Sequence, residues 1–215
     1  MSFKKNCRLR FAQSVLAAAA IAPLTPVAAQ TIISEVFYDA VGQDNGQVFV
    51  ELYGTPGTLL DGLFLDGING TDGSAYLTVA LTGTIGNDGV FVIGDDSGDG
   101  STLVSGFDLV ANVDFQNGPD SVVLRDSGGI LDALGYGDFT SAVFAGEGSA
   151  APDVDNGWSL ARASLLDTDN NVVDFLGLSV PTPGIVPASA VPVPPALVLF
   201  LSGIAGLVGV ARRKC

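Results

Sequence analysis

Residues 32–53 read IISEVFYDAVGQDNGQVFVELY and contain the pattern that decides the fold. Two runs of β-branched and aromatic residues, 32–38 and 48–53, lie on either side of the dipeptide Asn45-Gly46. Such residues favour strands, and Asn-Gly is among the strongest short turn signals because its residues tolerate positive φ. The stretch therefore predicts two strands separated by a turn.

The same pattern continues along the chain. Asn-Gly and Asp-Gly dipeptides occur nine times between residues 45 and 157, with short strand-like runs between them. No long helical period interrupts these runs, so we expect an all-β sandwich or barrel, with residues 140–155 as a long surface loop. The further predicted strands are 63–65, 76–81, 90–93, 121–125, 130–136 and 158–162, and the residues expected to be buried are Ile33, Val36, Val50, Leu52, Val92, Val122, Leu124 and Trp158.

The amino-terminal residues predict an export signal. Basic residues at positions 4, 5, 8 and 10 precede the apolar stretch 15–22, and Val27-Ala28-Ala29 places small residues before Gln30. This order predicts a signal peptide over 1–29 that is cleaved before Gln30. Cys7 leaves with it, so Cys215 remains alone and no intramolecular disulfide is expected in the exported chain.

The carboxyl-terminal residues predict a membrane tail. Val191-Pro192-Val193-Pro194 is followed by the uncharged apolar run 196–211 and then by Arg212, Arg213 and Lys214. The run is slightly shorter than the ~20 residues of an ordinary spanning helix, and the basic end is expected on the cytoplasmic side at 212–215. Pro-rich residues 180–193 predict a stiff linker between body and tail, with the sorting motif in 185–195. The alternative is a plain membrane anchor.

These ordered features resemble the PEP-CTERM sorting tails of Gram-negative bacteria, in the variant that reads Val-Pro-x-Pro-Ala. The resemblance implies that Val191, Pro192, Pro194, Arg212 and Arg213 form the sorting signal. It also implies retention in the inner membrane and processing by an exosortase-like enzyme. After processing, the body would reside at the cell surface or outside the cell.

The body of the chain is similar to bacterial lamin-tail-like domains. The resemblance implies an immunoglobulin-like β-sandwich over residues 30–184. Its landmarks are Ile33-Ser34-Glu35-Val36, Phe49-Val50-Glu51-Leu52-Tyr53, Leu60-Asp61-Gly62, Phe91-Val92-Ile93, residues 120–126, residues 129–133, Ser159-Leu160-Ala161-Arg162, Asp174-Phe175 and Pro181-Thr182-Pro183-Gly184.

The exported body is strongly acidic. All 23 Asp and Glu residues lie in it, and of the nine Lys and Arg only Arg125 and Arg162 oppose them, which gives 2 − 23 = −21. Nucleic acid binding depends on neutralised phosphates, so such a charge excludes nucleic acid as a partner. It attracts cations instead.

The sequence contains no histidine, which removes the usual hydrolytic triads and most zinc sites. Catalysis would have to use carboxylates, and Glu35 and Glu51 are the pair to consider because both lie in predicted strands. A glycosidase needs two carboxyl groups about 5 to 10 Å apart. The alternative is that both face solvent or pair with Arg125 or Arg162.

Two segments have the alternating oxygen ligands of a calcium loop. Asp95, Ser97 and Asp99 lie in GDDSGDG, and Asp167, Asp169 and Asn171 lie in LLDTDNN. The alternative is that each segment is only a turn, since Asp and Asn favour turns. Calcium is therefore the one cofactor that the sequence suggests.

Trp158 is the sole tryptophan. It shares a predicted strand face with Leu160, so we expect a core anchor, the alternative being a platform on which a carbohydrate stacks.

Two functions fit these patterns. The first is a non-enzymatic, envelope-anchored surface or matrix module that interacts with polysaccharide or protein. The second is a carboxylate-based enzyme that acts on extracellular polysaccharide. A convergent, buried carboxyl pair in a cleft would favour the enzyme, and scattered surface acids would favour the module.

Overall fold

The computed structural model describes residues 30–140 and 143–186. These residues form strands and one very short helix. In chain order the elements are β1 (Ile32–Phe37), β2 (Phe49–Tyr53), β3 (Phe64–Asn69), β4 (Ala75–Ala80), β5 (Val90–Asp95), β6 (Leu109–Ala111), β7 (Asp120–Arg125), β8 (Ile130–Tyr136), β9 (Ser159–Arg162), α1 (Asn171–Asp174) and β10 (Phe175–Leu178).

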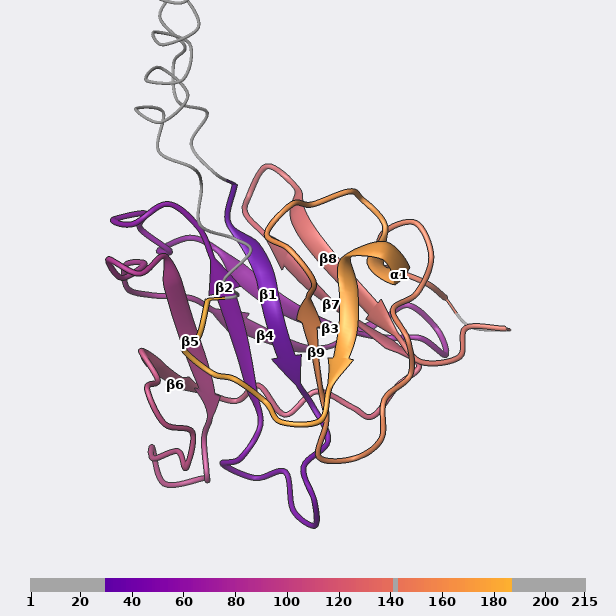
Figure 1. The fold of residues 1–215 in the computed structure, drawn as a ribbon, viewed down its shortest axis with the longest axis horizontal. Coiled ribbons are helices and arrows are strands. Elements are labelled where there is room, and N and C mark those ends of the chain that lie inside the picture. Colours follow the sequence, from indigo (N-terminus) through magenta and orange to yellow (C-terminus); the bar gives the residue numbers. More distant parts are fainter. Residues whose placement is uncertain (1–29, 141–142, 187–215) are drawn as a thin grey trace, which may run out of the picture.

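The strands form two sheets (Figure 1). The six-stranded sheet has the order β10-β9-β1-β2-β5-β6, and the four-stranded sheet has the order β4-β3-β7-β8. Neighbours are antiparallel except β5 and β6, which are parallel. The prediction of an all-β body is confirmed.

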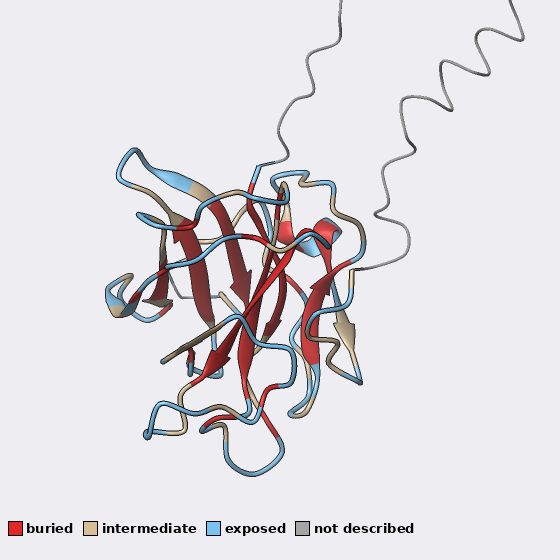
Figure 2. Ribbon diagram, turned by 90° about the vertical axis from the view of Figure 1, so that its left-hand side faces the viewer, coloured by how far each residue is buried: buried red, intermediate tan, exposed pale blue. Residues whose placement is uncertain are grey.

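A shared apolar core joins the two sheets. Tyr38, which follows β1, stacks on Tyr136 of β8 with ring centroids 4.2 Å apart, so the stack spans both sheets. Figure 2 shows that the strands are mostly buried and that the loops at both ends are mostly exposed. Seven of the eight residues expected to be buried are buried: Ile33, Val36, Val50, Leu52, Val92, Val122 and Leu124.

Trp158 is the exception, because 38% of its surface is exposed. It precedes β9 and lies beside β10, a strand that the sequence did not predict. The prediction that Trp158 anchors the core is therefore wrong.

The turn signals hold with one clear exception. Seven glycines of the nine Asn-Gly and Asp-Gly pairs, at positions 46, 62, 73, 89, 100, 118 and 157, have positive φ. Asp66-Gly67 instead lies inside β3. A Cβ on Gly67 would lie 2.6 Å from Cζ of Tyr76 and 2.9 Å from Cδ1 of Phe115, so this glycine makes room for aromatic rings.

The outer face of the six-stranded sheet, turned away from the core, is also covered. Phe49, Val90, Val92 and Val104 form a second buried apolar cluster, and Val186 packs against it. Residues 179–186, here called the C-terminal segment, lead from β10 to that cluster. In Figure 1 this segment is the yellow end of the chain, which crosses in front of β1 and β2.

The predicted stiff linker begins inside this C-terminal segment. Its described part, 180–186, lies against the sheet instead of extending away from the body. No helix among the described residues is long and apolar enough to cross a membrane. The predicted signal peptide, the apolar run 196–211 and the sorting residues Val191, Pro192, Pro194, Arg212 and Arg213 lie outside the described residues.

Candidate functional site

Glu35 and Glu51 stand side by side on the outer face of the six-stranded sheet. They are register partners on β1 and β2, and each is only 2% exposed. An irregularity between Ile33 and Glu35 shifts the strand by one residue, so Ile33 and Val36 both reach the core although they are three positions apart. The same shift places Glu35 opposite Glu51. The expectation that the two carboxylates face solvent or pair with arginine does not describe them.

Neutral donors surround the Glu35 carboxylate. The Oγ of Ser159 donates to Oε1 at 2.5 Å, and the backbone N–H of Thr182 donates to the same oxygen at 2.9 Å. The Thr182 hydroxyl donates to Oε2 at 2.6 Å. Both oxygens therefore have partners, and Thr182 of the C-terminal segment supplies two of the three donors.

The Glu51 carboxylate is held in the same way. The Ser34 hydroxyl donates to Oε1 at 2.7 Å, and the backbone N–H of Gly184 donates to Oε2 at 2.7 Å. Burial raises the pKa of Glu51 to about 7, and the nearby Glu35 carboxylate adds to the rise, while these two hydrogen bonds oppose it. Near neutral pH the Glu51 carboxyl group therefore loses and gains a proton.

A cavity of about 290 Å³ adjoins the carboxyl pair. The aliphatic side chains of Leu176, Leu178 and Ile185 contribute to its wall, together with Ala161 and Ala163 of the β9 region. The carboxyl pair, the C-terminal segment and this cavity together form the candidate site. An apolar cavity beside two carboxyl groups is an arrangement in which a small organic group could approach an acid and a base.

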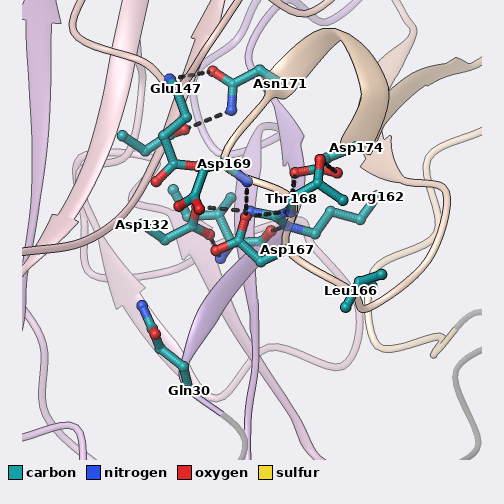
Figure 3. A network of polar contacts seen from close by, with 12 residues as sticks. Gln30, Asp132, Glu147, Arg162, Leu166, Asp167, Thr168, Asp169, Asn171 and Asp174 are labelled. Atoms are coloured by element: carbon teal, nitrogen blue, oxygen red, sulfur yellow. Dashed lines mark hydrogen bonds and ion pairs between the residues drawn. The ribbon is translucent and has the colours of Figure 1, made fainter.

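A second buried acidic cluster lies around Arg162 at the end of β9 (Figure 3). The Arg162 side chain is fully buried, with Nη2 2.7 Å from Oδ1 of Asp132 and Nη1 3.0 Å from Oδ2 of Asp174. Its Nη1 also lies 3.4 Å from Oδ1 of Asp167, and its Nε donates to the carbonyl of Ile33 at 2.8 Å. Arg162 thus connects the two sheets through β1, β8 and β9.

The predicted calcium ligands of the second segment separate into different roles. Asp167 accepts from Arg162, whereas Asn171 is fully buried and faces β8. The Asn171 amide donates to the carbonyl of Ala133 at 2.7 Å and accepts from the N–H groups of Gly135 and Glu147 at 2.8 and 2.9 Å. The exposed Asp169 has positive φ, at 54°. Asn171 therefore ties the start of α1 to β8 and to the loop around Glu147.

A different set of acids converges beside Asp167. Oxygens of Asp132, Glu147 and Asp167 all lie within 4.8 Å of one another. Burial, followed by the charges of Asp132 and Asp167, raises the pKa of Glu147 to about 8, and its Oε2 is buried without a hydrogen-bond partner among the described residues. This is the described group whose geometry comes nearest to a cation site, although Arg162 already supplies positive charge there.

The first predicted calcium segment forms turns. Asp95 is buried and accepts from the N–H groups of Gly46 and Val113 through its two oxygens, at 2.7 and 3.0 Å. Ser97 donates its N–H to the carbonyl of Ser101, and Asp99 accepts from the N–H and hydroxyl of Ser101. Each carboxylate of the triplet thus has its own backbone partner.

The sequence singles out Glu35, Glu51 and Arg162, but it does not indicate which residues contact them. The donors Thr182 and Gly184 lie far from both glutamates in sequence, and nothing local signals their contact. Asp132 and Asp174 follow apolar strand-like residues, which gives no sign that they are ion-pair partners of Arg162.

Comparison with protein-family models, with curated proteins and with solved structures finds no match. The function must therefore be argued from the geometry.

Proposed function

We propose that this chain is an exported, non-enzymatic β-sandwich module of the immunoglobulin-like kind, attached to the cell envelope by its carboxyl-terminal tail. The tail would be held in the inner membrane and processed by an exosortase-like enzyme. The body would face the periplasm first and the cell surface or extracellular matrix after processing. Its work would be interaction with polysaccharide or protein.

One observation carries this proposal: every oxygen of the Glu35–Glu51 pair accepts a hydrogen bond from the protein itself. A glycosidase needs one carboxyl group that can protonate the leaving oxygen and another that can reach the sugar or a water. Here the C-terminal segment lies over both glutamates and uses them as its attachment points. This supports a structural role for the pair.

A second candidate is the carboxylate-based enzyme acting on extracellular polysaccharide. Its support is the pKa of Glu51, about 7, which suits a general acid at neutral pH, together with the adjoining cavity. In this case the C-terminal segment would have to move away before a sugar could reach the pair.

Hydrolysis assays separate the two candidates. The full-length chain, purified in a mild detergent, is incubated with neutral, amino and anionic polysaccharides, and new reducing ends are counted. The module releases none above the buffer value. Release that disappears in Glu35→Gln and Glu51→Gln, but persists in the exposed-residue control Asp61→Asn, would establish the enzyme instead.

Protease treatment tests the export part of the proposal. With basic clusters at both ends of the chain, protease added to spheroplasts should digest the body. Replacing Pro192 and Pro194 by Ala should leave the tail inserted but abolish the size change that marks processing. A protected body would refute the orientation, and unchanged processing would reduce the tail to a plain anchor.

A further inference from the structure

Trp158 lies at the surface beside the edge strand β10. Its neighbour there is Gly177, which pairs with Leu160 across the β9–β10 ladder. A Cβ on Gly177 would lie 3.3 Å from Cε3 of Trp158 and 2.8 Å from Cγ1 of Val154. Because Gly177 has no side chain, the indole can rest against the edge strand while 38% of Trp158 stays exposed.

The turn before β9 places two carboxylates next to this ring. The Trp158 N–H donates to the carbonyl of Asp155 at 3.0 Å, which closes the turn. Asp153, Asp155 and Trp158 line one hollow of about 290 Å³, together with Pro152, Val154 and Gly177. An aromatic side chain and two acids therefore share one concave surface.

These carboxylates differ from the buried ones because they are exposed and accept no hydrogen bond from the residues that the structure describes. Asp153 and Asp155 are both exposed, and no hydrogen bond or ion pair joins either carboxylate to another described residue. Many other aspartates of the body cap turns, as Asp72, Asp96 and Asp126 do. Capping of a turn therefore does not explain why aspartates occupy positions 153 and 155.

We propose that Trp158, Asp153 and Asp155 form a binding site for a polysaccharide that carries free amino groups, of the glucosamine type. The indole offers a flat apolar surface on which a sugar ring can stack. It also attracts an ammonium group through the cation–π interaction, and the two carboxylates accept from ammonium and hydroxyl groups.

The charge of the body selects among glycans. Its net charge of 2 − 23 = −21 repels anionic polysaccharides and attracts cationic ones. A neutral glycan could stack on Trp158 but would gain nothing from the charge. An amino glycan therefore fits both the local groups and the overall field. This inference rests on the proposed module function and names its ligand class.

Trp158 is the sole tryptophan of the chain, so tryptophan fluorescence reports directly on binding at this site. The full-length chain is titrated with a glucosamine hexamer while tryptophan emission is recorded, and the N-acetylated hexamer, a neutral glucose hexamer and a lysine hexamer are titrated in parallel. The glucosamine hexamer should change the emission saturably, bind about tenfold more tightly than its N-acetylated form, and weaken with added salt. The absence of a saturable change with the glucosamine hexamer would overturn the proposal, as would equal or tighter binding of the lysine hexamer.

Variants show which groups carry the binding. Asp153→Asn with Asp155→Asn should weaken the glucosamine hexamer about tenfold, whereas Asp61→Asn with Asp72→Asn, which changes the net charge equally in two other exposed turns, should weaken it by less than about twofold. Trp158→Ala should lose sedimentation with an insoluble glucosamine polymer. Equal weakening by the two double variants would overturn the site, and this result would leave the hydrolysis and export tests of the module untouched.

Discussion

Two threonine–carboxylate pairs in this molecule have the same hydrogen bonds, but only one of the two carboxylates also contacts a cation. Thr182 donates its N–H and its hydroxyl to Glu35, and Thr168 donates its N–H and its hydroxyl to Asp174. Asp174 also has the Arg162 guanidinium at 3.0 Å, whereas the described partners of Glu35 are all uncharged. The same motif, a threonine that donates its N–H and its hydroxyl to one carboxylate, therefore occurs once beside a cation and once with uncharged partners alone.

The presence or absence of a cation gives the Arg162 cluster and the Glu35–Glu51 pair different properties. Around Arg162, ion pairs connect β8, β9 and α1, so the carboxylates can stay charged while buried. Around Glu35 and Glu51 the donors are uncharged hydroxyl and N–H groups, so no cation offsets the burial that raises the pKa of Glu51. The first cluster ties strands of both sheets together, whereas the second holds the C-terminal segment and contains Glu51, whose pKa is about 7.

The largest effect is expected from removing the cation. Arg162→Met leaves Asp132 buried without its counter-charge, which should cost about 3 to 5 kcal/mol of unfolding free energy in urea titrations. The matched control is Arg125→Met, whose ion pair with Asp66 is partly exposed and should matter far less. Equal losses in the two variants would mean that burial of the charges does not decide their importance.

The next effect concerns pH. The native pKa of Glu51, about 7, exceeds its ordinary value of 4.5, so the folded state binds the proton more tightly. The contribution of Glu51 is fully present below about pH 4.5 and is lost as pH rises through 7, a change of about 3 kcal/mol for a shift of this size.

Unfolding measured from pH 4.5 to 8 in Glu51→Gln should lack this part of the decline, because the amide does not titrate. Glu147→Gln is the control in the arginine cluster. It should remove a decline that extends about one pH unit higher, since the pKa of Glu147 is about 8. A Glu51→Gln profile parallel to that of the unchanged chain would contradict the titration of Glu51 in this range.

A smaller effect should follow when the threonine hydroxyls are removed. Thr182→Ala leaves Oε2 of Glu35 without its donor, and the loss of about 1 to 2 kcal/mol should fall on the C-terminal segment. Hydrogen exchange of peptides covering 179–186 should then be faster by roughly tenfold. Thr168→Ala leaves Asp174 with Arg162, so exchange near α1 should change less, and the reverse ranking would break the comparison.

The smallest effect is expected from calcium. Oxygens of Asp132, Glu147 and Asp167 converge, but Arg162 already contacts two of these residues. We expect calcium to stabilise the chain beyond matched sodium chloride by no more than about 1 kcal/mol at a few times its Kd. Asp167→Asn should abolish this difference in thermal unfolding and Asp99→Asn should not; the opposite pattern would move the site to the first segment.

Much of the fold could be predicted because local patterns determine it. Alternating residues such as Val50 and Leu52 face the core, and Asn-Gly turns such as 45–46 have the positive φ that glycine permits. Strands β6 and β10 were not predicted: both are short strands at the edges of the six-stranded sheet, and pairing at a sheet edge is a contact between distant segments that no local pattern signals. Asp66-Gly67 matches the turn pattern but lies in β3. Its glycine makes room for the rings of Tyr76 and Phe115, which come later in the chain and which no local pattern reveals.

The site was predictable only in part. The sequence indicates Glu35 and Glu51 in strands, but their closeness depends on a register shift in β1 that leaves no mark on composition. The packing of Trp158 against the edge strand depends on Gly177, which belongs to a strand that the sequence did not predict. Contacts between distant segments, rather than local propensity, decide both features.

The C-terminal segment also determines how the body would respond to mechanical load. Tension applied beyond Val186 reaches the packing of that residue first and then the hydrogen bonds of Gly184 and Thr182, one after another. Their rupture would free residues 179–186 to extend to a span of at most roughly 27 Å. Only then would β10 peel from β9, beginning at the Leu178–Ser159 pair. The C-terminal segment would thus detach and extend under tension before the load reaches the strands of the sheet.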